Sequence, residues 1–137
     1  MRILITSTST DMGKILTEGL SDDKEVVQLD RVQPQPFNVN TDLIKGIDAI
    51  VHLLDTDIKT DVSTSLDLAM RGTYDYCGWL AKRNTRVVLL SSLSLFGKYD
   101  GDMRVTETWR PTVTTAPKIL CNHLAEYVCR NLPERPT

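Results

Sequence analysis

The chain has 137 residues, the length of one domain, and it is long enough to bury a core without disulfides or metals. Its formal net charge of −2 gives no basic field, so we expect no nucleic-acid partner. No apolar run reaches the length that spans a membrane, and the first residues lack the pattern of a signal peptide. We therefore expect a cytoplasmic protein with no membrane partner.

Cysteine and histidine are sparse. Cys77, Cys121 and Cys129 make an odd number without CxxC spacing, which favours reduced, packed thiols. His52 and His123 lie far apart in sequence and show no metal-ligand spacing, so no metal site is expected. On a predicted central strand, His52 is interpreted as a hydrogen-bonded core residue rather than as a catalyst.

The first half of the chain alternates between strand and helix patterns. Residues 2–6 are continuously apolar after Arg2, which is typical of a strand buried on both faces. Residues 11–20 carry apolar side chains at helical spacing, with either Thr8 or Thr10 as the cap and Asp11 at the positive end. Strands are also predicted at 25–30 and 48–54, with a proline-containing loop at 31–36 and a short strand at 37–39.

The second half continues the alternation. Apolar residues recur at three- and four-residue steps over residues 62–82, which predicts a long helix, and Gly72 inside it suggests close packing. A strand is predicted at 86–90, followed by a loop with Gly97, Gly101 and Pro111. The last helix is predicted over 117–131, where Pro117 suits the first turn.

Strands that alternate with helices predict one α/β domain over residues 1–137. We expect a Rossmann-type, doubly wound parallel sheet of about five strands in three αβα layers, with strand order 3-2-1-4-5. The ligand crevice of such a sheet lies at the carboxyl ends of the strands, which fall here at Thr6, Asp30, Leu54 and Ser92.

Several segments, taken in order, resemble the extended short-chain dehydrogenases, the NAD-dependent epimerase/dehydratase family. The resemblance covers nearly the whole chain. It rests on the first strand, the second strand ending at Asp30, an Asp-Leu pair, a strand 48–53, a Gly-Thr pair and a serine-rich segment. The Asp-Leu pair is Asp42-Leu43, the Gly-Thr pair is Gly72-Thr73 and the serine-rich segment is Ser91–Gly97. Glu107, Pro111 and Glu126 also fall in place. The resemblance implies an NAD(P)-binding domain; family members are about twice as long, because later strands carry their substrate-binding part.

The family's glycine loop is altered here. The family reads Thr-Gly-x-x-Gly-x-x-Gly, whereas this chain has Ser7 and Thr10 at the first two glycines and keeps only Gly13. The first glycine allows the tight turn and the second lets the backbone approach a pyrophosphate, so Thr10 should crowd that approach and Asp11 adds a negative charge. Gly13 is interpreted as a packing residue, and hydroxyl donors leave weak binding open.

The family's catalytic positions are altered as well. Counting back from Glu126 places Lys118 at the tyrosine and Asn122 at the lysine of the family's Tyr-x-x-x-Lys pair. Lysine replaces that phenol poorly unless it is strongly desolvated, and asparagine supplies no positive charge. The family's helix asparagine falls at Ala69. Ser92 occupies the catalytic serine position, and we interpret it first as a strand-end serine that satisfies backbone groups.

The resemblance implies NAD or NADP as cofactor, with binding weakened or lost. Asp30 favours NAD because a carboxylate repels a 2′-phosphate, and Arg31 beside it weakens that preference. Asp30 could equally serve only as a cap for the next loop. The cofactor-binding positions implied are Ser7, Thr10, Met12, Gly13, Asp30, Arg31, Asp42, Leu43, Leu53 and Leu54. The catalytic candidates are Ser92 and Lys118.

Three hypotheses follow. The first is an epimerase/dehydratase-like dinucleotide-binding domain with impaired catalysis and a regulatory or structural role. The second is an active NAD(P)-dependent oxidoreductase or epimerase acting on a nucleotide sugar or a similar small molecule, and the third is a protein-interaction module that binds no nucleotide. The apolar strand 86–90 should form an exposed sheet edge, which we expect a second chain or a C-terminal part to cover. Relatives of this kind commonly form dimers through the helices that correspond to 62–82 and 117–131, so the resemblance implies a homodimer through these surfaces.

Overall fold

The computed structural model describes residues 1–30, 42–54, 61–112 and 114–132. Four strands form one parallel sheet in the order β2-β1-β3-β4. They are β1 (Arg2–Thr6), β2 (Glu25–Leu29), β3 (Ala49–Leu53) and β4 (Arg86–Leu90). The predicted doubly wound parallel sheet is confirmed with these four strands. The strand predicted at 37–39 lies outside the described residues.

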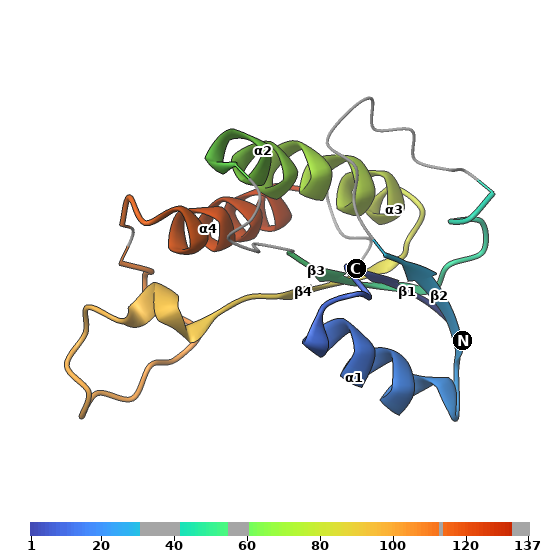
Figure 1. The fold of residues 1–137 in the computed structure, drawn as a ribbon, viewed down its shortest axis with the longest axis horizontal. Coiled ribbons are helices and arrows are strands. Elements are labelled where there is room, and N and C mark those ends of the chain that lie inside the picture. The colour runs from blue at the N-terminus through green and yellow to red at the C-terminus, as the bar shows by residue number, and fades with distance from the viewer. Residues whose placement is uncertain (31–41, 55–60, 113, 133–137) are drawn as a thin grey trace.

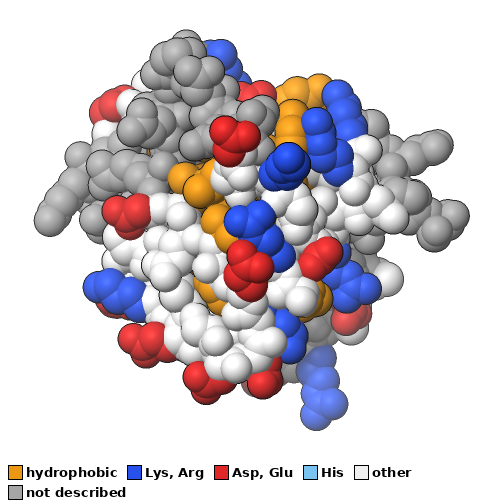
Figure 2. Space-filling model, turned by 90° about the vertical axis from the view of Figure 1, so that its right-hand side faces the viewer, with side chains coloured by type: hydrophobic (Ala, Val, Ile, Leu, Met, Phe, Trp, Pro, Cys, Tyr) orange, Lys and Arg blue, Asp and Glu red, His pale blue; other side chains and the backbone are white. Residues whose placement is uncertain are grey.

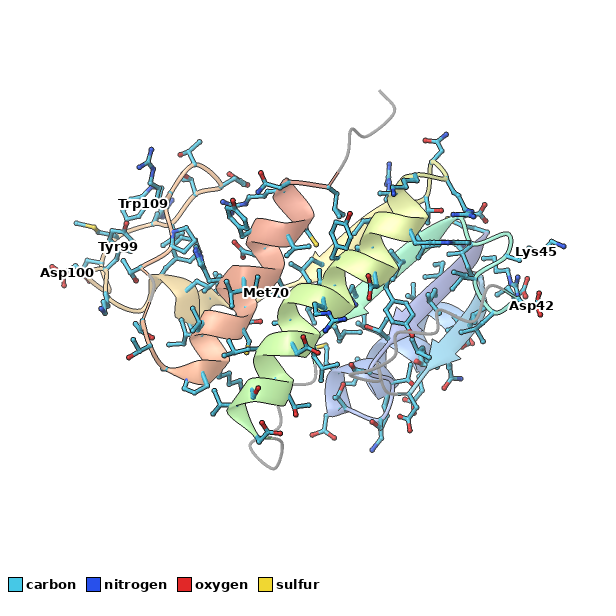
Figure 3. All side chains as sticks on the ribbon, turned by 90° about the horizontal axis from the view of Figure 1, so that it is seen from above. Asp42, Lys45, Met70, Tyr99, Asp100 and Trp109 are labelled. Carbon is cyan, nitrogen blue, oxygen red and sulfur yellow. The ribbon has the colours of Figure 1, made fainter. Side chains whose placement is uncertain are left out.

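Helices cover both faces of the sheet, which gives the predicted three layers (Figure 1). α1 (Asp11–Ser21) lies on one face and packs on β1 and β2. On the other face, a long helix over residues 62–81 lies beside α4 (Pro117–Arg130), as the view from above shows (Figure 3). All three helices begin and end within one residue of their predicted bounds.

The long helix is not α-helical throughout. It begins as α2 (Val62–Asp67), widens into the π-helical segments η1 (Leu68–Gly72) and η2 (Tyr74–Gly78), and closes as α3 (Trp79–Ala81). The sequence did not predict these wider turns, because apolar residues at three- and four-residue steps fit an ordinary helix equally well. Between η1 and η2 stands Thr73, whose buried side chain faces the sheet.

Two apolar clusters fill the space between the layers. The larger lies under the long helix and α4 and is centred on Leu4, Ile50, Cys77 and Leu80. The smaller lies under α1, where Ile3, Ile5 and Leu53 pack against Leu16 and Leu20. The central strands β1 and β3 are therefore almost wholly buried.

β4 is less covered than the other strands. Val88 is 44% exposed and Leu90 39% exposed. They pair in register with Val51 and Leu53, which pack on the α1 side of the sheet, but α1 lies over β1 and β2 instead (Figure 1). Among the described strands β4 also forms one edge, so the predicted exposed apolar edge is present.

Charge is mixed over the side of the molecule that carries the β2 edge. Acidic and basic side chains lie among one another there, with small apolar areas between them (Figure 2). This face shows no broad area of one sign, as the small net charge of −2 leads one to expect.

Candidate functional site

The loop after β1 closes on itself through hydroxyl groups. Ser7 has a φ of 53°, the left-handed conformation that favours glycine, and its Oγ donates to the carbonyl of Leu53 at 3.0 Å. Thr10 Oγ1 donates to the carbonyl of Ser7 at 2.7 Å and accepts from the amide of Gly13 at 3.1 Å. The two side chains that replace the family's glycines thus bind the loop and the neighbouring strand.

Thr10 is the N-cap of α1, as one of the two predicted alternatives had it. Its hydroxyl satisfies an amide at the first turn of the helix, where a dinucleotide-binding loop would present such an amide to a phosphate. Asp11, exposed in the same turn, adds a negative charge beside it, and Met12 is 46% exposed. A bound pyrophosphate fits this turn poorly, because it would meet a hydroxyl already in use and a carboxylate that repels it.

Gly13 is required for packing. A Cβ at this position would lie 2.4 Å from the carbonyl oxygen of Ser7 and 2.7 Å from the Cα of Thr8, and both are backbone atoms. Any side chain would push α1 away from the loop. The interpretation of Gly13 as a packing residue is therefore confirmed.

A series of buried, hydrogen-bonded polar side chains runs from β1 through β3 to the long helix, next to this loop. His52 Nδ1 lies 3.1 Å from Thr6 Oγ1, and His52 Nε2 lies 3.1 Å from Thr73 Oγ1. Burial lowers the pKa of His52 to about 4, so the ring is neutral at physiological pH. The interpretation of His52 as a hydrogen-bonded core residue is confirmed.

The partners of His52 were not predicted. Thr6 Oγ1 also accepts from the Leu53 amide at 2.9 Å and lies 3.1 Å from the Leu53 carbonyl. Thr73 belongs to the Gly-Thr pair noted in the sequence, but nothing in the sequence indicated its role, because it meets His52 only once the long helix packs on the sheet.

Ser92 lies two residues beyond β4, at the carboxyl edge of the sheet. Its hydroxyl accepts from the amide of Ser94 at 3.2 Å and lies 2.8 Å from Ser94 Oγ, so it caps the 3-10 turn η3 (Leu93–Phe96). A strand-end serine that satisfies backbone groups was the first interpretation of Ser92, and the geometry agrees with it.

Lys118 and Asn122 lie one turn apart in α4. Asn122 is only 6% exposed, and its side-chain amide donates to the carbonyl of Lys118 at 3.1 Å. Lys118 itself is exposed. A lysine becomes a base near neutral pH only when it is strongly desolvated, so this position lacks the burial that such a role requires. Ala69, at the family's asparagine position, is fully buried in η1.

The remaining cofactor candidates divide into two groups. Leu53 is buried beside Ser7, Leu54 follows it half-buried, and Asp30 is exposed directly after β2, so all three lie at the carboxyl edge. Asp42 and Leu43 instead belong to the turn 42–46, whose Lys45 carbonyl accepts from the side chain of Arg2 at the start of β1. The structure therefore does not bring that turn together with Ser7 and Thr10, and Figure 3 shows Asp42 beside Lys45. Arg31 lies outside the described residues.

Residues 97–112 form a loop that extends beyond the sheet and is held by aromatic contacts. The rings of Tyr99 and Trp109 meet edge to face at 4.8 Å, and the Tyr99 hydroxyl donates to the Arg110 carbonyl at 3.0 Å (Figure 3). Thr112 anchors the loop through its amide, which donates to the Leu95 carbonyl at 2.7 Å. These contacts are structural, and they hold the loop beside η3.

Comparison with solved structures decides the fold. A short-chain dehydrogenase/reductase superfamily protein from Agrobacterium tumefaciens, with bound NAD, superposes with a TM-score of 0.76 at 19% identity, over 95% of this chain and 44% of that one. The chain shares the fold of this protein. A hypothetical dTDP-4-dehydrorhamnose reductase from Sulfolobus tokodaii matches with a TM-score of 0.75 at 20% identity, over 93% of this chain and 51% of that one.

A third neighbour is the ADP-L-glycero-D-manno-heptose-6-epimerase of Helicobacter pylori, with a TM-score of 0.71 at 14% identity, over 93% of this chain and 50% of that one. The chain thus spans about half the length of these neighbours. The expected resemblance to extended short-chain dehydrogenases is confirmed at the level of the fold.

Other comparisons and searches gave no match. No protein-family model matches the sequence, and neither does any curated protein. Within the described ranges, no helix combines the length and the apolar character needed to cross a membrane. The same ranges contain no group of three or more side chains suited to hold a metal ion.

Proposed function

We propose that this chain is a catalytically silent, epimerase/dehydratase-like dinucleotide-fold domain with weakened cofactor binding and a regulatory or structural role. The single observation that carries the proposal is the hydrogen bond from Asn122 to the Lys118 carbonyl. At the position where the family's lysine holds the nicotinamide ribose, a buried neutral amide binds its own helix. An acid–base pair for hydride or proton transfer has no counterpart there.

The loop after β1 supports weakened binding. Thr10 Oγ1 uses the Gly13 amide, and Asp11 repels a diphosphate from the same turn. A cofactor would have to displace the threonine hydroxyl and overcome that repulsion. Asp30, exposed after β2, repels a 2′-phosphate, so residual affinity is greater for NAD than for NADP.

Cofactor titration tests the proposal. Melting of the purified chain is followed with NAD, NADP and their reduced forms, and turnover of nucleotide sugars is assayed alongside. We expect a melting shift only at millimolar NAD, a smaller one with NADP, and no turnover. A shift at micromolar cofactor together with turnover would contradict the proposal.

A gain-of-binding variant makes the test sharper. In Ser7→Gly/Thr10→Gly the hydroxyls leave the loop, the amide of Gly13 becomes free, and the backbone can approach a phosphate. We expect NAD affinity to rise by at least about tenfold, or roughly 1.4 kcal/mol. Ser7→Ala/Thr10→Ala is the matched control, because it removes the same hydroxyls but leaves two Cβ atoms in the way.

An active oxidoreductase or epimerase is the second candidate, favoured by Ser92 and Asp30 at the carboxyl edge of the sheet. An interaction module that binds no nucleotide is the third, favoured by the self-closed loop and the exposed β4. A complex with a dinucleotide seated against Ser7 and Thr10 would reject the module. Complete absence of a melting shift, in the chain and in its double-glycine variant, would favour it.

A further inference from the structure

Two cysteines that are far apart in sequence meet between the helices above the sheet. Cys77 lies in η2 and is fully buried, whereas Cys129 lies near the end of α4 and is half-buried. Cys129 packs against the cluster to which Cys77 belongs, where α4 contacts η2. The nearby Cys129 thiol is the largest cause that raises the pKa of Cys77. Neither thiol takes part in the loop or in the α4 positions discussed above.

The side chain of Leu132 packs closely on η2 at this point. Gly78 follows Cys77, and a Cβ on it would lie 3.3 Å from Cδ2 of Leu132, just beyond the end of α4. The missing side chain lets the end of α4 come near to η2. The third cysteine, Cys121, lies two turns earlier in α4, is 1% exposed and serves as an internal reference.

We propose that Cys77 and Cys129 form a redox site that hydroperoxides oxidise to a disulfide, which fastens the end of α4 to η2. Because α4 packs on η2 and both side chains belong to the same cluster, side-chain rotation can bring the two sulfurs to the bond length of about 2 Å. The site is independent of the dinucleotide loop, so it stands whether or not a cofactor binds.

The chemistry proceeds in two balanced steps. The thiolate of Cys129 attacks the terminal oxygen of a hydroperoxide, the oxygen–oxygen bond breaks, and a sulfenic acid and an alcohol (water, for hydrogen peroxide) are formed. Cys77 then attacks the Cys129 sulfur and releases water, so two thiols are oxidised by two electrons and one peroxide is reduced.

Exposure decides the order of these steps. Cys129 is the half-buried thiol and can meet a small oxidant. Contact with Cys129 and burial raise the pKa of the Cys77 thiol well above its usual range, which suppresses its thiolate. Cys77 is therefore the resolving thiol, and the disulfide forms slowly, over minutes or longer.

Peptide mapping tests the proposal. The reduced chain is treated with a small excess of hydrogen peroxide, the peroxide is removed, and the chain is unfolded in denaturant so that free thiols, buried ones included, are alkylated. It is then digested without reductant for mass spectrometry. We expect a linked peptide pair containing Cys77 and Cys129, two hydrogens lighter than the separate peptides, while Cys121 is alkylated. The melting temperature of the oxidised chain should rise by roughly 5–10 °C and return on reduction.

Two variants complete the test. Cys121→Ala should keep the linked pair and the melting shift, whereas Cys129→Ser should lose both. Cys129→Ser alters a half-buried residue and so preserves the core that Cys77→Ala would open. A linked pair that includes Cys121, a Cys129 sulfinic acid beside a free Cys77 in the wild type, or a melting shift that survives in Cys129→Ser would overturn the proposal.

Discussion

His52 Nε2 lies 3.1 Å from the hydroxyl of Thr73, and this contact joins the middle of the sheet to the π-helical part of the long helix. Since Thr6 holds the other ring nitrogen, either neutral tautomer of His52 can be satisfied. A protonated ring would need an acceptor on each side, in a place fully closed to water. Both threonine hydroxyls could accept from such a ring, so it is burial of the charge that opposes protonation and keeps the ring neutral.

Acid should destabilise the fold through this residue. The pKa of His52 is about 4 in the folded chain against an ordinary value of 6.5, so between these values only the unfolded chain takes up the proton. The free energy of unfolding should fall as the pH drops from 6.5 to 4, by roughly 3 kcal/mol from this group, and then level off.

Denaturant titrations across this pH range measure the effect. His52→Gln should be less stable at neutral pH, and its free energy of unfolding should change less between pH 6.5 and 4. His123→Gln, which alters a half-buried histidine of α4, is the control and should keep the wild-type slope. Equal slopes in the wild type and in His52→Gln would show that His52 does not dominate acid sensitivity.

Ser7 should reverse the usual ranking of alanine and glycine. With a φ of 53°, alanine keeps the strain of the left-handed conformation and loses the hydrogen bond to Leu53, which should cost about 1–2 kcal/mol. Glycine loses the same bond but relieves the strain. Chemical denaturation should therefore find Ser7→Gly more stable than Ser7→Ala, and the opposite order would mean that this φ is not maintained in solution.

Two glycines of α1 should respond oppositely to alanine. Gly13→Ala places a Cβ 2.4 Å from a backbone oxygen, so the helix must move, and we expect a loss of roughly 3 kcal/mol or more. Gly19 has no atom within 4 Å of its would-be Cβ, so Gly19→Ala should raise stability by up to about 1 kcal/mol. Thermal or denaturant melting of the two variants compares them directly, and similar effects would contradict the packing role of Gly13.

The exposed edge predicts self-association. We propose that isolated chains associate through Val88 and Leu90 on β4. An apolar edge strand presents exposed apolar side chains as well as unpaired backbone groups to a second chain. Leu90→Lys should shift the chain toward the monomer in sedimentation or light scattering. Ile15→Lys, at a residue of α1 that is 62% exposed, is the control and should change little.

The helical layer provides the competing outcome. Met70 is 46% exposed and Tyr127 61% exposed on the layer formed by the long helix and α4, and Met70 is labelled there in Figure 3. If Met70→Lys abolishes association and Leu90→Lys does not, the dimer forms through the helices. A monomer at high concentration in the unaltered chain would remove both proposals.

Local patterns in the sequence predicted the fold well. The order of elements follows from short-range rules on spacing and turns, and the same rules limited the cap of α1 to Thr8 or Thr10, of which the structure shows Thr10. The packing role of Gly13 was implied by the family resemblance. What the sequence could not supply were contacts between distant segments, such as Ser7 with Leu53 and His52 with Thr73. These contacts depend on how strands and helices pack, and a hydroxyl has many partners of similar energy to choose from.

The position of the turn 42–46 illustrates the same limit. The resemblance placed Asp42 and Leu43 near a cofactor from the order of segments alone. The hydrogen bond between Arg2 and the Lys45 carbonyl ties that turn to the start of β1, whereas the crevice lies at its end. A motif of two common residues carries too little information to fix a position in space.

The hydroxyl of Thr10 accepts the hydrogen bond, at the first turn of α1, that a ligand phosphate would otherwise accept. In an empty phosphate-binding loop, the amides at the start of the helix face water, and their hydrogens exchange with solvent readily. Here the Gly13 amide is already engaged, on a residue that is itself buried. Its hydrogen should therefore exchange with solvent slowly in the free chain, and adding NAD should leave that rate almost unaltered.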